Sequence, residues 1–246
     1  MVLGFRIRWA VGLAMALMMV SCTSSTAPSE STPVAAAEPA EVAAIPMPEG
    51  MVQLQGTATV ELLVNGERIV IEVDGAQAPI TAGNFVDLVE RDVYDGTVFH
   101  RVVREPQPFV VQGGDPQSKD PSVPVQQLGT GGFIDPDTQE ERMVPLEITP
   151  EGADQPLYSQ TFEMAGESAK PALQHTHGAV AMARSQFPDS ASAQFYFALA
   201  DLPFLDGSYA VFGYVSEGLE VVDNIQQGDV IESATVIDGL DALVSE

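Results

Sequence analysis

The chain has 246 residues, with 35 acidic side chains against 10 lysines and arginines, a formal net charge of −25 and a pI near 4.1. A field of this sign repels nucleic-acid phosphates and anionic membrane surfaces, which argues against nucleic acid as a partner. The sequence contains 1 cysteine, Cys22, so no intramolecular disulfide can form and a packed core must hold the fold together.

An export signal is predicted at the N-terminus. Two arginines precede the apolar run Trp9–Val20, which is shorter than the roughly 20 residues that a membrane-spanning helix needs. The run ends in the letters MVSC, and the small residue before Cys22 resembles the lipobox of a bacterial lipoprotein signal. We therefore predict a signal peptide at 1–21 and acylation of Cys22. An ordinary secretory signal and an uncleaved anchor are the alternatives.

The segment 22–50 is rich in Ser, Thr, Pro, Ala and Glu and contains no aromatic residue. Such a composition cannot bury enough surface to offset the entropy of ordering, so we predict a disordered tether. The remaining part, 51–246, has a length suited to one domain with a substantial core.

Alternating apolar runs predict strands through most of this domain. The clearest pair, TATVELLV and ERIVIEVD, flanks Asn65-Gly66, and an Asn-Gly between such runs is a strong hairpin signal. A short strand is also expected at Met143–Ile148. In AQFYFAL, alternation places Gln194 and Tyr196 on the face opposite the three apolar residues; in VFHRVV it places Phe99, Arg101 and Val103 on one face.

Two helices are predicted. The first begins behind Thr81 as N-cap and stops near Asp95-Gly96. The second carries Leu219, Val222 and Ile225 and ends before Gly228. Many short strands with two helices indicate a mainly β fold, a closed antiparallel barrel without exposed edges. The long connections Pro116–Gly132 and Asp135–Pro171 are of a length that is usually functional or flexible.

Five motifs follow one another in order: FHRVV, PFVVQGGD, AMAR, AQFYFAL and LPFLDGSYAVFG. Together they resemble the cyclophilin-type peptidyl-prolyl cis-trans isomerases, from about Thr57 to Leu243. The resemblance implies an eight-stranded cyclophilin-like closed antiparallel barrel with two short helices. It also implies an enzyme without cofactor or metal that accelerates rotation about X-Pro bonds in proline-containing polypeptides during the folding of exported proteins.

The resemblance also implies the site, position by position. The arginine of FHR, which the family uses in catalysis, is Arg101. The positions implied to bind substrate are Phe109, Val110, Gln112, Ala183, Arg184, Gln194, Tyr196, Phe204, Leu205 and Tyr209. Five of these depart from the family pattern: Val110 replaces Met, Arg184 Asn, Tyr196 Phe, Phe204 Trp and Tyr209 His. Tyr196 adds a hydroxyl to a pocket that receives proline, and loss of the Trp implies weak cyclosporin binding.

The chemistry of the reaction agrees with an arginine at this place. Rotation of an X-Pro bond is opposed by amide resonance, with a barrier of about 18–20 kcal/mol, and no bond has to break. In the twisted transition state the prolyl nitrogen regains a lone pair, so a fixed donor aimed at it lowers the barrier. A guanidinium stays charged and is rigid. Apolar walls disfavour the charge-separated resonance form.

Several readings stay open from the sequence. Arg184 could contact the substrate backbone, contact an acidic side chain of a partner, or pair with Asp189. His175 and His177 form a His-x-His, for which we expect no metal because no third ligand is near in sequence. The rival function is a proline-peptide binding scaffold or chaperone with little turnover.

The location expected for the protein is outside the cytoplasm. We predict an exported monomer, tethered to a membrane through a lipid anchor on Cys22. The wording AQFYFALADLPFLDGSYAVFGYV is similar to that of cyanobacterial cyclophilins, which leaves the periplasm and the thylakoid lumen as the two candidate compartments.

Overall fold

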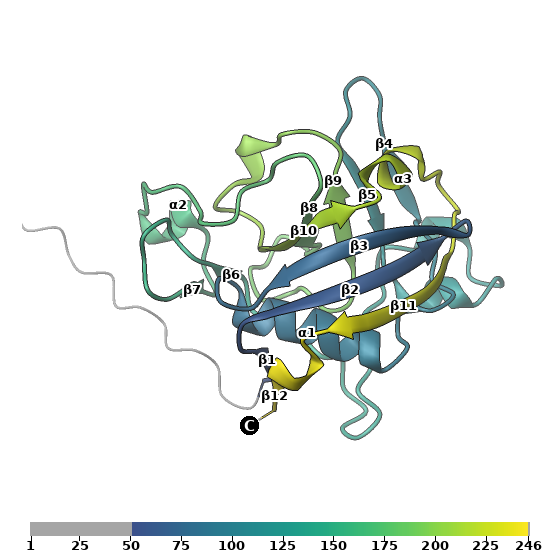
Figure 1. The fold of residues 1–246 in the computed structure, drawn as a ribbon, viewed down its shortest axis with the longest axis horizontal. Coiled ribbons are helices and arrows are strands. Elements are labelled where there is room, and N and C mark those ends of the chain that lie inside the picture. Colours follow the sequence, from purple (N-terminus) through teal and green to yellow (C-terminus); the bar gives the residue numbers. More distant parts are fainter. Residues whose placement is uncertain (1–50, 246) are drawn as a thin grey trace, which may run out of the picture. The chain divides into compact units, whose positions relative to one another are not determined.

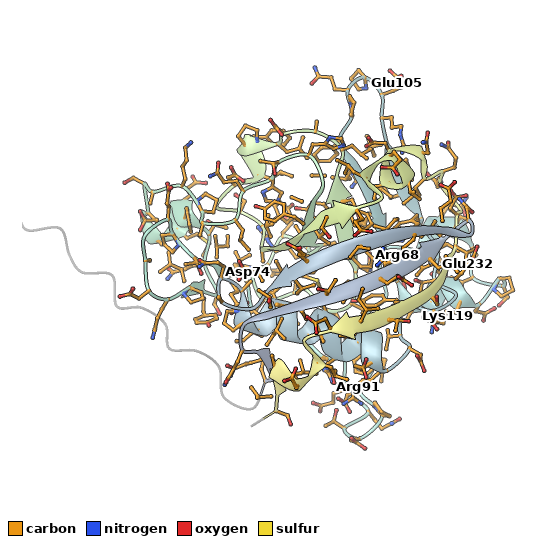
Figure 2. The ribbon with its side chains drawn as sticks, viewed as in Figure 1. Arg68, Asp74, Arg91, Glu105, Lys119 and Glu232 are labelled. Atoms are coloured by element: carbon orange, nitrogen blue, oxygen red, sulfur yellow. The ribbon has the colours of Figure 1, made fainter. Side chains whose placement is uncertain are left out.

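The computed structural model describes residues 51–245 (Figure 1). The signal peptide at 1–21, the tether at 22–50 and the acylated Cys22 predicted above lie outside these residues. The described residues belong to one compact unit, whose side chains are drawn in Figure 2. Within it, none of the helices has the length and apolar character required to span a bilayer.

Strands dominate the fold, as predicted, and most of them are short. The strands are β1 Gln53–Leu54, β2 Thr57–Val64, β3 Glu67–Asp74, β4 Arg101–Val103, β5 Val110–Gly113, β6 Glu147–Ile148, β7 Leu157–Tyr158, β8 Ala179–Met182, β9 Phe195–Ala198, β10 Val211–Glu217, β11 Ile231–Asp238 and β12 Leu243–Val244. The helices are α1 Pro79–Glu90, α2 Phe162–Ala165 and α3 Leu219–Asn224. Short 3₁₀ turns, including Pro203–Leu205, join some of them.

One antiparallel sheet of eight strands forms the body of the domain, in the order β11-β2-β3-β10-β8-β9-β5-β4. The β2–β3 hairpin crosses the front of Figure 1 as two long arrows. Its turn residues Asn65 and Gly66 have φ of 54° and 74°, the left-handed pair that an Asn-Gly turn supplies. The predicted hairpin is confirmed.

The sheet curls so that its two outer strands approach each other. The residues just before β4 and β11 meet through the antiparallel bridge between Val98 and Val230. Phe99 N donates to Asp229 O at 2.8 Å, and Ile231 N donates to Thr97 O at 2.8 Å. The mainly β fold with an eight-stranded antiparallel sheet is confirmed, but the barrel is not fully closed, because its outer strands meet through a short bridge rather than a full ladder.

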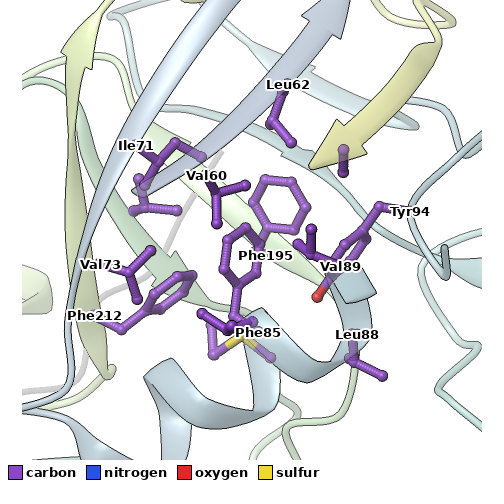
Figure 3. Close-up of a cluster of buried hydrophobic side chains, with 14 of the residues drawn as sticks. Val60, Leu62, Ile71, Val73, Phe85, Leu88, Val89, Tyr94, Phe195 and Phe212 are labelled. Atoms are coloured by element: carbon purple, nitrogen blue, oxygen red, sulfur yellow. The ribbon is translucent and has the colours of Figure 1, made fainter. Parts of the chain in front are cut away.

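The main core fills the concave side of the sheet (Figure 3). Phe85, Leu88 and Val89 of α1 pack against Val60, Leu62, Ile71 and Val73 of the hairpin and against the aromatic rings of Phe195 and Phe212. This burial follows from alternation in β2, where every second residue is buried. The core therefore holds α1 against the inner face of the sheet.

The N-terminus of α1 is capped by a distant carboxylate. Glu147, which is 1% exposed, accepts from Ile80 N at 3.1 Å and from Thr81 N at 2.8 Å. The prediction of Thr81 as N-cap is wrong, because α1 begins two residues earlier, at Pro79, and Ala78 is the cap position. A proline is compatible with the first turn because its missing N–H needs no partner there.

Several other boundaries differ from the prediction. The strand expected at Met143–Ile148 is reduced to a bridge at Val144 and the two residues of β6. The second helix, α3, ends at Asn224, before Gly228. A third, one-turn helix, α2, lies in the long connection between β7 and β8.

The parity prediction for VFHRVV is wrong. Phe99 is fully buried in the main core, whereas Arg101 is exposed. The ladder of β4 starts only at Arg101, and Phe99 belongs to the bridged seam before it. The alternation therefore slips between these two residues, and Arg101 faces outward.

A second, smaller apolar cluster covers part of the convex side. It joins Val110 of β5, Ala179 and Ala181 of β8, Tyr196 and Ala198 of β9, and Val211 of β10 to Leu202. The 199–210 segment folds over these strands, so their outward residues are buried as well. The edge of this cluster is where the candidate site lies.

Candidate functional site

The register of three adjacent strands brings the main candidate residues together. Arg101 of β4 pairs with Gln112 of β5, and Gln112 pairs with Tyr196 of β9. Residues directly opposite each other share one face of a sheet. Arg101, Gln112 and Tyr196 therefore form a row across the convex face, and Val110, two residues before Gln112, lies on the same face.

Arg101 is held by neighbours that leave its charge unneutralised. Its Nη1 donates to Gln112 Oε1 at 3.2 Å, and its guanidinium carbon lies 5.6 Å from the centroid of the Phe109 ring. Gln112 Nε2 donates to Gln194 Oε1 at 3.1 Å, and Gln194 Nε2 donates to Gly131 O at 2.7 Å. This chain of amides orients the guanidinium without a carboxylate.

A cavity of about 280 Å³ opens beside this row, and we call it the Arg101 cavity. Nine of the predicted site residues line it: Arg101, Phe109, Val110, Gln112, Ala183, Arg184, Tyr196, Leu205 and Tyr209. The other two are close but not part of the lining. Gln194 supports Gln112 as described, and Phe204 stacks on Phe109 with centroids 6.0 Å apart and remains 69% exposed.

The hydroxyl of Tyr196 is engaged with a residue that does not line the cavity. It lies 2.9 Å from His175 Nε2, and His175 Nδ1 lies 2.8 Å from Asp206 Oδ1. The ring of Tyr196 therefore lines the Arg101 cavity, whereas its hydroxyl, which was predicted to lie in the pocket, is hydrogen-bonded to His175. Burial raises the pKa of Tyr196, and the neighbouring Tyr209 raises it further.

His175 connects two walls of the Arg101 cavity. Its side chain reaches Tyr196 of β9 and Asp206, which follows the 3₁₀ turn carrying Phe204 and Leu205. Its backbone N–H also donates to Asp206 Oδ1 at 2.8 Å, and its carbonyl accepts from Leu202 N at 2.7 Å. Burial lowers the pKa of His175, against the opposing effect of Asp206. A neutral ring that donates from Nδ1 and accepts at Nε2 satisfies all three groups.

Arg184 does not form the ion pair with Asp189 that was considered from the sequence. Its Nε and Nη2 donate to Ser208 O at 3.1 and 2.6 Å, and its Nη1 donates to Ser185 O at 2.9 Å. Its guanidinium carbon lies 4.6 Å from the centroid of the Tyr209 ring. Asp189 instead accepts from Leu146 N at 3.2 Å. The pairing is wrong because the backbone carbonyls hold Arg184 at the cavity.

The two histidines of the His-x-His have separate roles. His175 is buried as described, whereas His177 Nε2 lies 2.8 Å from Asp223 on the surface. Among residues 51–245 there is no group of three or more potential metal ligands. The role of His175 was not predicted from the sequence. The one available signal was its partner Asp206, which belongs to the motif LPFLDGSYAVFG.

A larger hollow, of about 540 Å³, lies beside α1 and the loop around Asp135. Its arginines, Arg91 and Arg142, are paired with Asp87 and Asp135. The Arg101 cavity differs in offering charged donors that no carboxylate of the described residues neutralises, set against aromatic and aliphatic walls. It contains no serine or cysteine among its lining residues, so the site offers hydrogen bonding and desolvation rather than covalent chemistry.

A family model supports this assignment: the one described as cyclophilin type peptidyl-prolyl cis-trans isomerase matches residues 59–240, which include all of these site residues. The chain belongs to the cyclophilin family. The resemblance stated from five motifs is thereby confirmed.

Two relatives show how far the similarity extends. The chain is 43% identical over 205 residues to a putative thylakoid lumen peptidyl-prolyl cis-trans isomerase of Synechocystis, covering 78% of this chain and 50% of the relative. It is 33% identical over 183 residues to a peptidyl-prolyl cis-trans isomerase of Helicobacter pylori, covering 74% of this chain and 88% of the relative. The chain thus spans half the length of the first relative and most of the second.

Solved structures share the fold. A cyclophilin type isomerase of Cryptosporidium parvum superposes with a TM-score of 0.54 at 22% identity, over 74% of this chain and 98% of that one. The same Cryptosporidium protein in the presence of the dipeptide Ala-Pro gives 0.53 at 23% identity, over 73% and 99%. At this identity the comparison confirms a cyclophilin fold.

Proposed function

We propose that this cyclophilin accelerates cis/trans rotation of X-Pro bonds in proline-containing polypeptides, with Arg101 as the catalytic residue. The observation that carries the proposal is the outward guanidinium of Arg101, oriented by Gln112 and Phe109 over a cavity with apolar walls. The relatives are named as peptidyl-prolyl cis-trans isomerases, which indicates the reaction. The geometry of the cavity indicates Arg101 as the group that can promote it.

The proline ring would enter the Arg101 cavity against Phe109, Val110 and Leu205. Removal of water from the amide disfavours its charge-separated resonance form. As the bond twists, the prolyl nitrogen gains a lone pair that the guanidinium can bind, and the planar ground state lacks this interaction. An acceleration of about 10⁵ requires about 7 kcal/mol of such differential stabilisation.

The supporting residues have distinct proposed roles. Gln112 and Gln194 orient Arg101 through the amide chain, and Tyr196 and Tyr209 form the wall opposite it. The rings of Tyr196 and Tyr209 meet edge to face at 6.1 Å. Ala183 leaves room for the substrate backbone, because its side chain is a single methyl group.

The test compares the wild-type chain with Arg101→Ala. Exchange rates of an Ala-Pro peptide, measured by NMR, should fall by about 10²- to 10³-fold in the variant, the effect of removing one transition-state donor. Arg104→Ala is the matched control, because Arg104 donates hydrogen bonds to Val222 O and Asp223 O near the end of α3 and does not line the Arg101 cavity. Equal rates for wild type and Arg101→Ala would refute the assignment.

The rival function is a scaffold that binds proline peptides with little turnover. The departures from the family pattern at Arg184, Tyr196 and Phe204 support it, because they change residues in or beside the Arg101 cavity while the cavity itself remains. Saturable peptide binding together with an uncatalysed exchange rate would establish it.

We further propose the setting in which the protein works. The domain 51–246 would be a monomer outside the cytoplasm, exported by the signal peptide at 1–21 and held to a membrane by an acyl chain on Cys22 through the tether 22–50. The similarity to proteins named as thylakoid lumen and chloroplastic supports export. Exposed Phe204 in place of Trp supports weak cyclosporin affinity.

A further inference from the structure

Arg184 lies where three hollows of the surface meet. It lines the Arg101 cavity, together with Tyr209. It also lines a neighbouring cavity of about 340 Å³ whose lining includes Glu141, which we call the Glu141 cavity, and the open hollow beside Phe204. Arg184 is therefore within reach of the residues next to a proline that occupies the Arg101 cavity.

The guanidinium of Arg184 is fixed but not neutralised. Three of its N–H groups donate to the carbonyls of Ser185 and Ser208, and the ring of Tyr209 lies against it. An arginine carries five N–H donors, so two remain for a ligand. No carboxylate of residues 51–245 forms a salt bridge with Arg184, although the chain as a whole carries a net charge of −25.

Arg101, the other arginine of the cavity, also lacks a carboxylate partner within the described residues. By contrast, Arg68, Arg91 and Arg142 are each paired with at least one acidic side chain. Arg104 also lacks a carboxylate partner among the described residues, but it donates to the carbonyls of Val222 and Asp223 and does not line the Arg101 cavity. Two of the three described arginines without a salt bridge therefore lie at this one cavity. A fixed guanidinium of this kind matches the planar, bidentate geometry of a carboxylate.

From these observations we infer that Arg184 is a specificity-determining residue that selects substrates with an acidic residue close to the proline. The inference rests on the proposed isomerase function and names its substrate class. The carboxylate would bind the two free N–H groups of Arg184 while the proline occupies the Arg101 cavity.

Two other charges oppose this preference, and the test separates them. The net negative field of the protein favours basic polypeptides at long range, but it is screened beyond about 8 Å at physiological salt. Glu141 lines the neighbouring cavity and would favour a basic side chain that enters it. A direct contact with Arg184 is screened less and persists in salt.

The experiment uses proline peptides that carry Glu, Gln or Lys at one of the two positions before or after the proline. Exchange rates by NMR and peptide affinities by titration calorimetry are measured for the full chain. We expect Glu to exceed Gln by about fivefold in kcat/KM at one of these positions, the size of a partly exposed ion pair. The preference should survive physiological salt.

Two variants and a control identify the residue responsible. Arg184→Gln should abolish the preference for Glu over Gln, and Arg184→Glu should reverse it in favour of Lys. Lys170→Glu makes the same change of charge on an exposed residue that lines none of the three hollows and should keep the wild-type preference. Turnover of the Gln peptide by the Arg184 variants shows that they are folded.

Equal values for Glu and Gln at every position in the wild type would overturn the inference. A Glu preference that remains in Arg184→Gln would overturn it as well, and a Lys preference in the wild type would assign selectivity to Glu141 instead. If no peptide is turned over, the proposed isomerase function fails, and the calorimetric affinities still decide whether Arg184 selects an acidic neighbour.

Discussion

The contact between Tyr196, His175 and Asp206 makes a prediction about how the walls of the Arg101 cavity are held together. Tyr196→Phe removes only a hydroxyl, leaving His175 Nε2 buried without its partner at 2.9 Å. We expect a loss of about 1 kcal/mol in the free energy of unfolding. His175→Ala removes two buried side-chain hydrogen bonds and the packing of the ring, for which we expect about 3 kcal/mol.

The double variant distinguishes a coupled contact from two independent ones. Once His175 is absent, the hydroxyl of Tyr196 has lost the partner seen in the structure, so the double variant should cost about 1 kcal/mol less than the sum of the single ones. His177→Ala is the matched control, since the contact of His177 with Asp223 has the same length, 2.8 Å, as the contact of His175 with Asp206 but is exposed.

The assay is urea unfolding followed by circular dichroism, because the only tryptophan, Trp9, lies outside the described residues. Additive costs for Tyr196→Phe and His175→Ala would refute the reasoning. So would a loss in His177→Ala as large as that in His175→Ala.

Three further predictions concern pH, stability and inhibition. Burial lowers the pKa of His100 and of His175 below the ordinary 6.5. The unfolded chain therefore binds protons that the folded chain does not. The free energy of unfolding falls as the pH drops below about 6.5, by up to about 1.4 kcal/mol per pH unit for each histidine. In urea titrations the stability of His175→Phe should depend less steeply on pH than that of the wild type, and an equally steep dependence would contradict this. Glu147→Ala should lower the free energy of unfolding, measured by thermal unfolding, by about 2–4 kcal/mol, because two buried N–H groups at the start of α1, one of them from Thr81, lose their acceptor. Glu147→Gln keeps one acceptor oxygen and should lower it less. Equal losses of stability in the two variants would argue against Glu147 as the cap of α1. Phe204→Trp should strengthen inhibition by cyclosporin in the exchange assay, since it restores the family's larger ring with its N–H donor, and an unchanged inhibition constant would show that another departure limits binding.

Much of the fold follows from local sequence signals. The Asn65-Gly66 turn and the alternation on either side of it predict the β2–β3 hairpin, and the structure confirms it. The eight-stranded barrel came from the resemblance to a family, because the pairing of β8 with β9 and β10 depends on contacts between distant segments.

The errors have identifiable physical causes. Thr81 has the side chain of an N-cap, but a carboxylate 66 residues away in sequence satisfies the start of α1, and no local pattern reveals Glu147 in that role. Phe99 and Arg101 do not share a face, because regular strand alternation is interrupted between them. Phe99 follows the bridge at Val98, and the ladder of β4 begins only at Arg101.

The motifs located the site well, but not the contacts beneath it. The motifs predicted that Arg101 and Tyr196 belong to one site, and the structure places both residues at one cavity. Strand alternation predicted the outward face of Tyr196 but assigned Arg101 to the face of the buried Phe99. Asp189 was the nearest acidic residue to Arg184 in sequence, yet backbone carbonyls of Ser185 and Ser208 hold the guanidinium instead. Backbone acceptors carry no sequence signature, so such a contact requires coordinates.

The most direct test of the account measures kcat and peptide affinity separately for Arg101→Ala and Arg101→Lys. If Arg101 binds the twisted amide more tightly than the planar one, kcat should fall by about 10²-fold or more in Arg101→Ala while the Kd of a proline peptide changes by less than about tenfold. Arg101→Lys should recover only part of the rate, because an ammonium lacks the fixed fork. A loss of affinity as large as the loss in kcat/KM, with kcat unchanged, would contradict transition-state stabilisation by Arg101.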